Sequence, residues 1–339
     1  MIEDNPVHAS ALRALAPIST IGRGNDVPAP DAWTGHWPTL ERDGFTLPAV
    51  AADHGGTGGE PPDELAVIHA CAAVAARCPL PETAVAGALL AAAGHAVPAG
   101  PLTLVPPAGC AGLALVDGLL EGVATGVPWA AQVGHALLPL SQGLALVTLE
   151  GCVIEAGRNL AGEPRDSVRF HRHRPVAVLP DASADALLLR GALMRSVQIC
   201  AAAEQALKLA IGYTTTRVQF GKPLASFQAV QHQIAGAASK LAAARILLDA
   251  AYDALASGDA GREIAAARIN ACLAGGECAS VAHQVHGAMG YAWEYDLHRH
   301  TSAIQAWRAE FGPLTYWAER LGAQAMAAPS VDLWQFITS

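Results

Sequence analysis

The first stretch of this chain suited to binding a nucleotide runs from Arg217 through Gln219, Phe220 and Gly221 to Pro223. A guanidinium offers a planar fork of donors that matches a phosphate group. The phenylalanine ring offers a flat face on which a purine can stack. The residue types therefore suit the two ends of an adenine nucleotide.

A second stretch combines an amide, an imidazole and two glycines, at Gln284, His286, Gly287 and Gly290. Because glycine has no side chain, the backbone there can approach a ligand closely. The residues by themselves are equally consistent with a loop between helices, with a surface arginine and helix-ending glycines.

Both stretches lie at helix ends in a C-terminal region, residues 181–339. We predict four helices there, over residues 185–216, 227–257, 262–288 and 316–327. The second helix has apolar residues at steps of three and four, which trace one helical face. Helices joined by short loops predict an antiparallel four-helix bundle.

Residues 1–98 are predicted to form a mostly helical domain, with helices over 63–76 and 83–95 and Thr83 as a helix cap. This domain precedes a region of different character, residues 99–180, in which short apolar runs are divided by Gly and Pro. Such runs indicate a small antiparallel β lobe.

Composition excludes several classes of protein. The 339 residues are 52% hydrophobic and 15% charged, so the chain has enough apolar surface to fold. The net charge of -9 argues against a nucleic-acid surface, which needs a basic footprint. The most apolar stretch, 84–105, is interrupted by His95, Pro98 and Pro101, so no membrane span is expected.

The cysteines and histidines indicate a reduced, cytoplasmic protein without a metal. The seven cysteines include no Cys-x-x-Cys pair, which argues against a zinc cage. His283, His286, His298 and His300 cluster in sequence, but no metal is expected on them. Glu204 and Lys208, spaced by four, are predicted to form a surface or interhelix pair of little energy.

Taken together, these features resemble the acyl-CoA dehydrogenase family over essentially the whole length. The run Arg217-x-Gln-Phe-Gly-x-Pro-Leu224, followed by Phe227-Gln-x-x-Gln231, is similar to the family's bundle signature. The spacing Gln284-x-x-Gly287-x-x-Gly290 is similar to its second signature.

The resemblance implies a flavoprotein that desaturates acyl-CoA thioesters between the α and β carbons. In the family a carboxylate removes the α proton and the β hydride passes to FAD. It also implies that FAD lies across a subunit interface. The β lobe of one subunit binds the flavin ring, and the helical bundle of the neighbouring subunit binds the ADP half. The residues implied to bind FAD are Arg217, Gln219, Phe220, Gln284, His286, Gly287 and Gly290.

The chain departs from the family where the catalytic base should be. Counting from Gln284 without gaps, the position of the base falls on Phe311, and a gap of one residue would bring Glu310 there. In another branch of the family the corresponding position is Gly191. Neither Phe nor Gly can take a proton, so no catalytic residue is assigned.

Much of the segment that binds the flavin ring in the family is also missing. Residues 103–112, where it is expected, are rich in Pro, Ala and Gly and offer few hydrogen-bonding side chains. The chain retains the residues implied to bind the ADP half of FAD but lacks those that would surround the flavin ring and the catalytic base. We therefore predict the base-lacking subunit of a heteromeric enzyme. The stretch Trp307-Arg-Ala-Glu-Phe-Gly312 is similar to the shorter subunit of bacterial α2β2 heterotetramers that act on steroid side chains, which implies a role in lipid degradation and steroid catabolism.

Two alternatives remain open. The chain can be a complete homo-oligomeric dehydrogenase that uses Glu310, or with less support Glu294 or Asp296. In that case apolar neighbours would raise the pKa of Glu310 by desolvation. It can also be a flavin-free binding or scaffold protein of the same fold.

Overall fold

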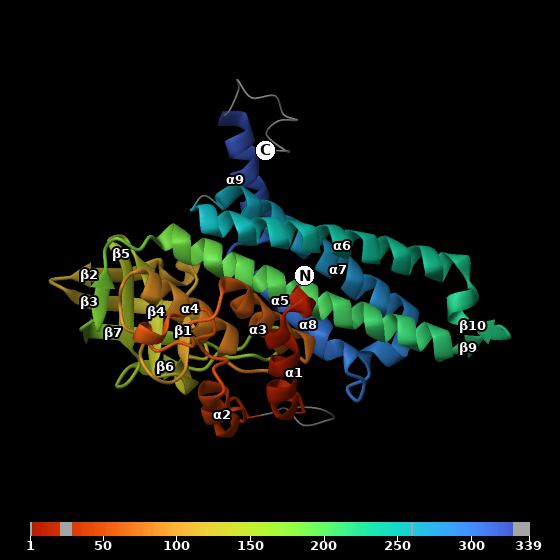
Figure 1. The fold of residues 1–339 in the computed structure, drawn as a ribbon, viewed down its shortest axis with the longest axis horizontal. Coiled ribbons are helices and arrows are strands. Elements are labelled where there is room, and N and C mark those ends of the chain that lie inside the picture. The colour runs from red at the N-terminus through yellow and green to blue at the C-terminus, as the bar shows by residue number, and fades with distance from the viewer. Residues whose placement is uncertain (1, 21–28, 259, 328–339) are drawn as a thin grey trace.

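A computed structural model describes residues 2–20, 29–258 and 260–327. A group of N-terminal helices and a β lobe both pack against the long helices of the C-terminal region (Figure 1). This order confirms the predicted fold class, mainly helical with a small β domain. The outermost parts of the predicted first and third domains, residue 1 and residues 328–339, lie outside the described residues.

The N-terminal helices cover one side of the bundle. They are α1 (Pro6–Ser19), α2 (Trp37–Arg42), α3 (Pro61–Ala73) and α4 (Leu80–Ala92). Short 3-10 turns connect the elements of the chain: η1 (Ile2–Asp4), η2 (Thr34–His36), η3 (Ala52–His54), η4 (Pro107–Cys110), η5 (Ala130–Gln132), η6 (Leu224–Ser226) and η7 (Gly287–Tyr291).

Thr83 does not cap a helix as predicted. Helix α4 begins earlier, at Leu80, and Thr83 is buried inside it. Its hydroxyl donates to the carbonyl of Pro79 and accepts from the N–H of Leu102, 3.0 Å away. The side chain therefore fastens α4 to the first strand of the β lobe.

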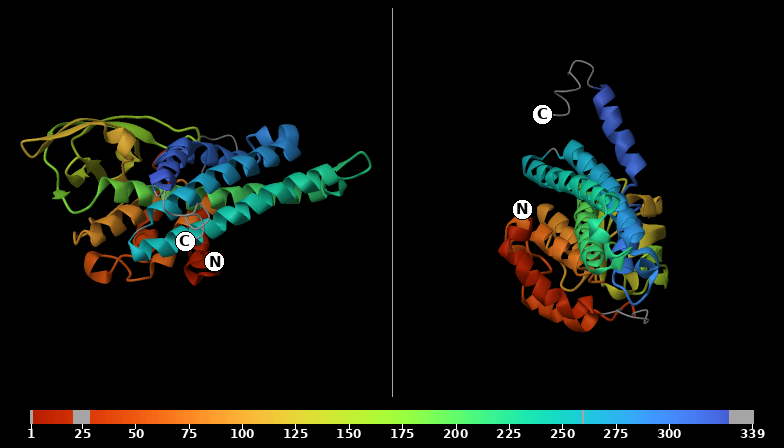
Figure 2. Two further views of the ribbon diagram at one scale, coloured as in Figure 1. Left: turned by 90° about the horizontal axis from the view of Figure 1, so that it is seen from above. Right: turned by 90° about the vertical axis from the view of Figure 1, so that its right-hand side faces the viewer.

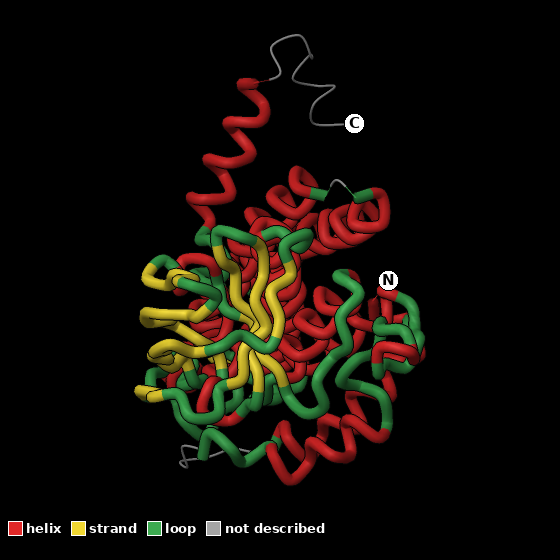
Figure 3. Tube along the Cα trace, turned by 90° about the vertical axis from the view of Figure 1, so that its left-hand side faces the viewer, coloured by secondary structure: helices red, strands yellow, loops and turns green. Residues whose placement is uncertain are grey.

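The β lobe contains two four-stranded sheets, which face the reader beside the helices in Figure 3. One has the order β1-β4-β5-β8 and the other β2-β3-β7-β6. The strands are β1 (Leu102–Leu104), β2 (Gly112–Val116), β3 (Leu119–Pro128), β4 (His135–Leu140), β5 (Gly143–Thr148), β6 (Val153–Glu155), β7 (Arg165–His173) and β8 (Ala177–Leu179).

The prediction of an antiparallel lobe is wrong for one pair of strands. Strands β1 and β4 run parallel, with Leu102 opposite His135, because the whole β2–β3 hairpin separates them in the chain. Asp117 and Gly118 have φ values of 51° and 75° and join β2 to β3 as a two-residue turn. Two positive φ values are typical of the type I′ turns that fit the twist of a hairpin.

The C-terminal region contains α5 (Ala184–Thr216), α6 (Gln228–Ser257), α7 (Gly261–His286), α8 (Leu297–Trp307) and α9 (Leu314–Ala327). Helices α5, α6 and α7 are long and pack together beside the β lobe, and α9 projects away from them (Figures 1 and 2). Helix α8 was not predicted, because its sequence, LHRHTSAIQAW, is largely polar. It nevertheless packs on α5.

Helix α5 is the central element of the fold. It is long and apolar enough to cross a membrane by length and composition, but 78% of its most apolar window is buried inside the protein. Leu187, Val197 and Ile199 are completely buried in the main core. This is the pattern of a core helix, whose apolar residues contact neighbouring elements on several sides.

A buried ionic cluster joins the N-terminal helices, the β lobe and the bundle. Nε of Arg195, on α5, lies 2.8 Å from Oε2 of Glu310, and its Nη2 lies 2.6 Å from Oε1 of Glu82, on α4. From β7, Arg165 donates to both oxygens of Glu310, at 2.8 and 3.0 Å. Asn159 donates to the same carboxylate at 3.2 Å.

These donors decide the protonation of Glu310. Burial alone would raise the pKa of Glu310, but the charges of Arg165 and Arg195, with hydrogen bonds from Arg165 and Asn159, lower it to about 2. The alternative prediction that apolar neighbours raise this pKa is wrong, because the sequence does not show that two arginines from other elements meet the carboxylate.

We expect Glu310→Gln to destabilise the protein by roughly 3–5 kcal/mol at pH 7, because both guanidinium groups would stay buried without their counter-charge. Urea denaturation measures this. As a control, Glu277→Gln removes one member of a half-exposed ion pair with Lys240 and should cost less than about 1 kcal/mol. Equal losses in the two variants would contradict the buried cluster.

The same cluster predicts a pH dependence. The folded pKa of Glu310, about 2, lies below its ordinary value of 4.5. Its stabilisation is therefore complete above pH 4.5 and is lost as the pH falls from 4.5 towards 2. The unfolding free energy of Glu310→Gln should fall less steeply than that of the native chain over this interval.

Candidate functional site

The first predicted motif forms a β-hairpin at the end of the bundle farthest from the β lobe (Figure 1). Helix α5 ends at Thr216, and the N–H of Arg217 donates to the carbonyl of Tyr213, 2.8 Å away. Strands β9 (Val218–Gln219) and β10 (Lys222–Pro223) then pair across a two-residue turn. The turn residues, Phe220 and Gly221, have φ values of 53° and 79°.

A pocket of about 560 Å³ lies between this hairpin and the end of α7. It brings together five residues from the two predicted motifs, which are more than sixty positions apart in the sequence. These five are Arg217, Gln219, Gln284, His286 and Gly287. Tyr213, Leu224, Gln233 and Met289 contribute to the same wall.

The lining of the pocket suits a nucleotide diphosphate. Among the described residues around it, Arg217 is the only one with a permanent positive charge. Gln219, Gln233 and Gln284 add three amides, each of which can donate and accept. The guanidinium of Arg217 suits a phosphate group. The amides beside it suit the neutral, hydrogen-bonding part of the same ligand.

Sequence reasoning did not identify Tyr213 or Gln233. Tyr213 precedes Arg217 by one helical turn, so it lies on the same side of α5. Gln233 follows Ala229 and Val230 by four and three residues on α6, and all three line the pocket. This helical spacing is a signal that could have identified both residues.

His286 is a buried, neutral part of the pocket wall. Its Nδ1 donates to the carbonyl of Ala282 at 2.7 Å, so its Nε2 accepts from the hydroxyl of Tyr295 at 3.0 Å. The ring stacks on Tyr213 with a centroid separation of 4.5 Å. Burial lowers the pKa of His286, partly opposed by the Ala282 hydrogen bond. His286 therefore supplies shape and contact area to the pocket rather than charge.

The two glycines of the second motif have different roles. Gly287 has a φ of 57° and a ψ of -136°, and no atom would touch a Cβ added there, so its open side faces free space. Gly290 does not line the pocket. A Cβ at Gly290 would lie 3.1 Å from Nδ1 of His283 and 3.1 Å from Cβ of His286. Gly290 thus allows the loop to pack closely behind the pocket wall.

Phe220 lies outside the pocket wall, at the tip of the hairpin. Its side chain is 89% exposed, and its ring meets Phe227 edge-on at 6.1 Å. Val218 and Tyr291 are also exposed, at 57% and 73%. Phe220 and Val218 belong to the same hairpin, and exposed apolar side chains of this kind are typical of surfaces that contact another molecule.

A second cavity, of about 790 Å³, lies between the β lobe and the bundle. Pro106, Ala108 and Gly109 line one side, and residues 309–313 line another. A Cβ at Gly109 would lie 2.2 Å from the carbonyl oxygen of Thr125, so this turn is packed directly on β3. Arg165 and Asn159 also line the cavity, but both already donate to Glu310.

The ring of Phe311 fills the space beside Gly191. A Cβ added to Gly191 would lie 2.2 Å from Cδ1 of Phe311, so the ring rests directly on the helix backbone. Phe311 is 1% exposed, and its carbonyl accepts from Nε1 of Trp317 at 3.0 Å. The two positions at which the sequence comparison placed a base are therefore in contact with each other, and neither offers a carboxylate.

Comparison with known proteins supports the fold and the resemblance of the C-terminal region. Residues 182–325 match the model of the acyl-CoA dehydrogenase C-terminal domain. Acyl-CoA dehydrogenase IpdE2 of Mycolicibacterium smegmatis is 25% identical, over 85% of this chain and 87% of its own length. IpdE2 of Mycobacterium tuberculosis is 36% identical over 32% of this chain and 32% of its own length.

Among solved structures, the Tcur3481-Tcur3483 steroid ACAD aligns with a TM-score of 0.87 and 22% identity, over 96% of this chain and 98% of the other. The ChsE4-ChsE5 complex of Mycobacterium tuberculosis aligns with a TM-score of 0.82 and 20% identity, over 97% and 100%. These matches confirm the predicted resemblance. Residues 182–325 match the acyl-CoA dehydrogenase C-terminal domain, and the chain as a whole has the fold of that family.

Proposed function

We propose that this chain is the base-lacking subunit of a heteromeric, FAD-dependent acyl-CoA dehydrogenase. The contact between Phe311 and Gly191 carries the proposal. A desaturase needs a carboxylate within hydrogen-bond reach of the α proton. Here the aromatic ring of one candidate position, Phe311, rests directly on the other, Gly191.

Glu310 does not replace the missing base. With a pKa of about 2, it stays ionised and is a very weak proton acceptor at neutral pH. Its two oxygens are also already bound by Arg165, Arg195 and Asn159. The alternative of a homo-oligomeric enzyme that uses Glu310 is therefore not supported. The α proton must be taken by a carboxylate of a partner subunit.

The nucleotide pocket supports a contribution to FAD binding. In this proposal the fork of Arg217 binds the diphosphate, the amides of Gln219 and Gln284 hydrogen-bond the adenosine half, and the open backbone at Gly287 lets it approach. When bound, FAD accepts the hydride from the β carbon of the substrate. The residues of this chain hold and orient its ADP half.

The exposed hairpin supports an interface with another subunit. Phe220 stands outside its own pocket, where it can reach a ligand shared with a neighbouring chain. The aligned ChsE4-ChsE5 structure is a complex of two different chains. We propose a similar partner for this chain, in a heterotetramer, and an acyl-CoA substrate with a bulky, steroid-type acyl group.

A cytoplasmic location belongs to the same proposal. All seven cysteines are free thiols, as expected of a protein in a reducing compartment.

The proposal is tested by purifying this chain alone and together with a candidate partner, a second chain of the same fold from the same organism. We expect acyl-CoA desaturation, followed with an artificial electron acceptor, only from the complex. Full flavin content and turnover by the chain alone would contradict the proposal. A complex that never contains flavin would instead support the alternative of a scaffold protein.

Within the complex, we expect Arg217→Ala to weaken FAD retention about tenfold to a hundredfold, because a charge-assisted hydrogen bond to phosphate is lost. Arg217→Lys should recover only part of this, since an ammonium keeps the charge but lacks the planar fork. Release of flavin fluorescence on dilution measures retention. Arg42→Ala, at an exposed site on α2, is the control. Equal retention in all variants would remove Arg217 from the site.

A helix substitution tests whether Phe311 fills the base position. Gly191→Ala should destabilise the chain by about 1–3 kcal/mol, because its Cβ would overlap the Phe311 ring. Gly236→Ala, on α6 where nothing lies within 4 Å of an added Cβ, should instead be neutral or stabilising. Both are measured by urea denaturation.

The double variant Gly191→Ala, Phe311→Leu should be less destabilised than the sum of its two single variants, because the smaller side chain makes room for the new methyl group. Strict additivity would show that the ring and the glycine are not in contact.

A further inference from the structure

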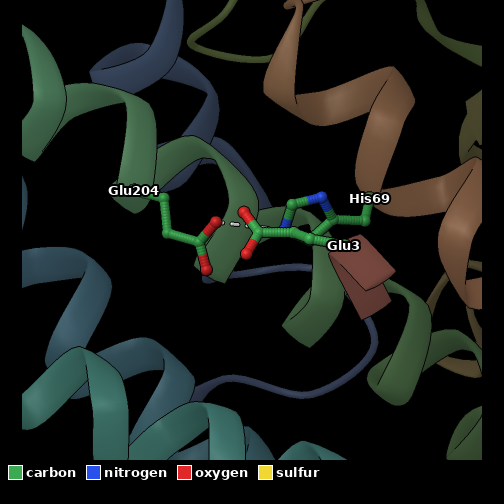
Figure 4. A group of neighbouring side chains, drawn as sticks. All are labelled: Glu3, His69 and Glu204. Atoms are coloured by element: carbon green, nitrogen blue, oxygen red, sulfur yellow. Dashed lines mark hydrogen bonds and ion pairs between the residues drawn. The ribbon is translucent and has the colours of Figure 1, made fainter. Parts of the chain in front are cut away.

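Three side chains outside the nucleotide pocket converge where the N-terminal segment meets the bundle (Figure 4). Glu3 comes from η1, His69 from α3 and Glu204 from α5. One ligand-type atom from each lies within 4.8 Å of the other two. Sequence analysis paired Glu204 with Lys208 and expected no metal. The structure instead pairs Glu204 with His69 and Arg245, so the predicted pair is wrong.

The spacing of the inner pair of atoms matches one edge of a tetrahedral metal site. Nε2 of His69 lies 3.2 Å from Oε2 of Glu204. Zinc bonds of about 2.0–2.1 Å in tetrahedral geometry separate neighbouring ligand atoms by roughly 3.3 Å. Both side chains are well buried and come from helices, so this edge is held rigidly. Glu3 is more exposed, so it can adjust to complete the third position.

Each of the three groups is also held by a further neighbour. Nδ1 of His69 lies 2.9 Å from Nε2 of His8. Arg245 lies 3.2 Å from Oε1 of Glu204, the oxygen that does not face His69, and 3.2 Å from Oε2 of Glu3. Partners of this kind fix the orientation of metal ligands and are a regular feature of metal sites.

The local charge and access also favour a cation. The carboxylates of Glu3 and Glu204 and the guanidinium of Arg245 leave one excess negative charge, and Asp249 lies close enough to raise the pKa of Arg245 further. Glu204 and Arg245 line a surface pocket of about 520 Å³ between α5 and α6. Glu3 is itself exposed, so an ion from solvent can reach the cluster on that side.

We propose that Glu3, His69 and Glu204 form a binding site for a divalent cation of the zinc type. The ion binds Nε2 of His69, Oε2 of Glu204 and one oxygen of Glu3, and water takes the fourth position. His69 is then neutral, with its proton on Nδ1 and donated to His8. Arg245 keeps its contacts with the two outer carboxylate oxygens. The site clamps the N-terminal segment onto α5, so its role is structural.

Without the ion, the same atoms must be arranged differently. An Nε2–H of His69 would donate to Glu204, and the contact with His8 would reverse or require a charged ring. The two states therefore differ in which atom opposes Oε2 of Glu204, a proton or a metal. Direct binding measurements distinguish them.

The test titrates the full-length chain, stripped with a chelator and dialysed, with zinc chloride in an isothermal calorimeter. We expect one ion per chain and a rise in the melting temperature with zinc. Glu3→Gln and Glu204→Gln should each weaken binding at least about tenfold. The matched control is Asp53→Asn, which alters an exposed histidine–carboxylate pair with His54 and should leave binding unchanged.

A cobalt(II) titration gives a second readout that does not depend on stability. Tetrahedral cobalt absorbs visible light much more strongly than the hydrated ion, so an intense band should appear in the native chain and be lost in Glu3→Gln. Glu3 is partly exposed, and its substitution should not prevent folding. Absence of zinc binding, or equal affinity in the native chain and both Gln variants, would overturn the proposal.

Discussion

The carboxylate of Glu310, bound by two buried guanidinium groups, is the constraint on which the rest of the architecture depends. Arg165 reaches it from the β lobe and Arg195 from the central helix, and Arg195 also holds Glu82 from the N-terminal helices. A charge buried so deeply is tolerated only with partners of this kind. Because the neighbouring residue is Phe311, fixing Glu310 also fixes the aromatic ring against Gly191.

This arrangement connects stability with the assignment of function. The position that would need a freely accessible carboxylate is closed by an aromatic ring, and the nearby carboxylate serves as a structural anion. The opposite end of the bundle keeps an arginine, three amides and an open glycine around one pocket. In the proposed function, the pocket end of the molecule holds the cofactor, and the other end offers no free carboxylate to take a proton. A subunit that completes its partner's site needs only the first.

The sequence predicted those features that depend on local spacing. The helices 185–216 and 227–257 and the two motifs around Arg217 and Gln284 all carry strong local signals. What it could not show depends on contacts between distant residues. Arg165 and Glu310 are 145 positions apart, and His69 and Glu204 are 135 apart. Helix α8 was missed because its few apolar residues, among them Leu297, Ile304 and Trp307, lie on one side of a helix that is otherwise largely polar.

The number of flavins per chain tests the central claim most directly. Native mass spectrometry of the complex with its partner, combined with flavin absorbance, counts both in one sample. If this chain supplies only the ADP half of a shared site, each pair of unlike chains should hold one FAD, and the isolated chain should hold none. Two flavins per pair, or a stoichiometric flavin on this chain alone, would contradict the account.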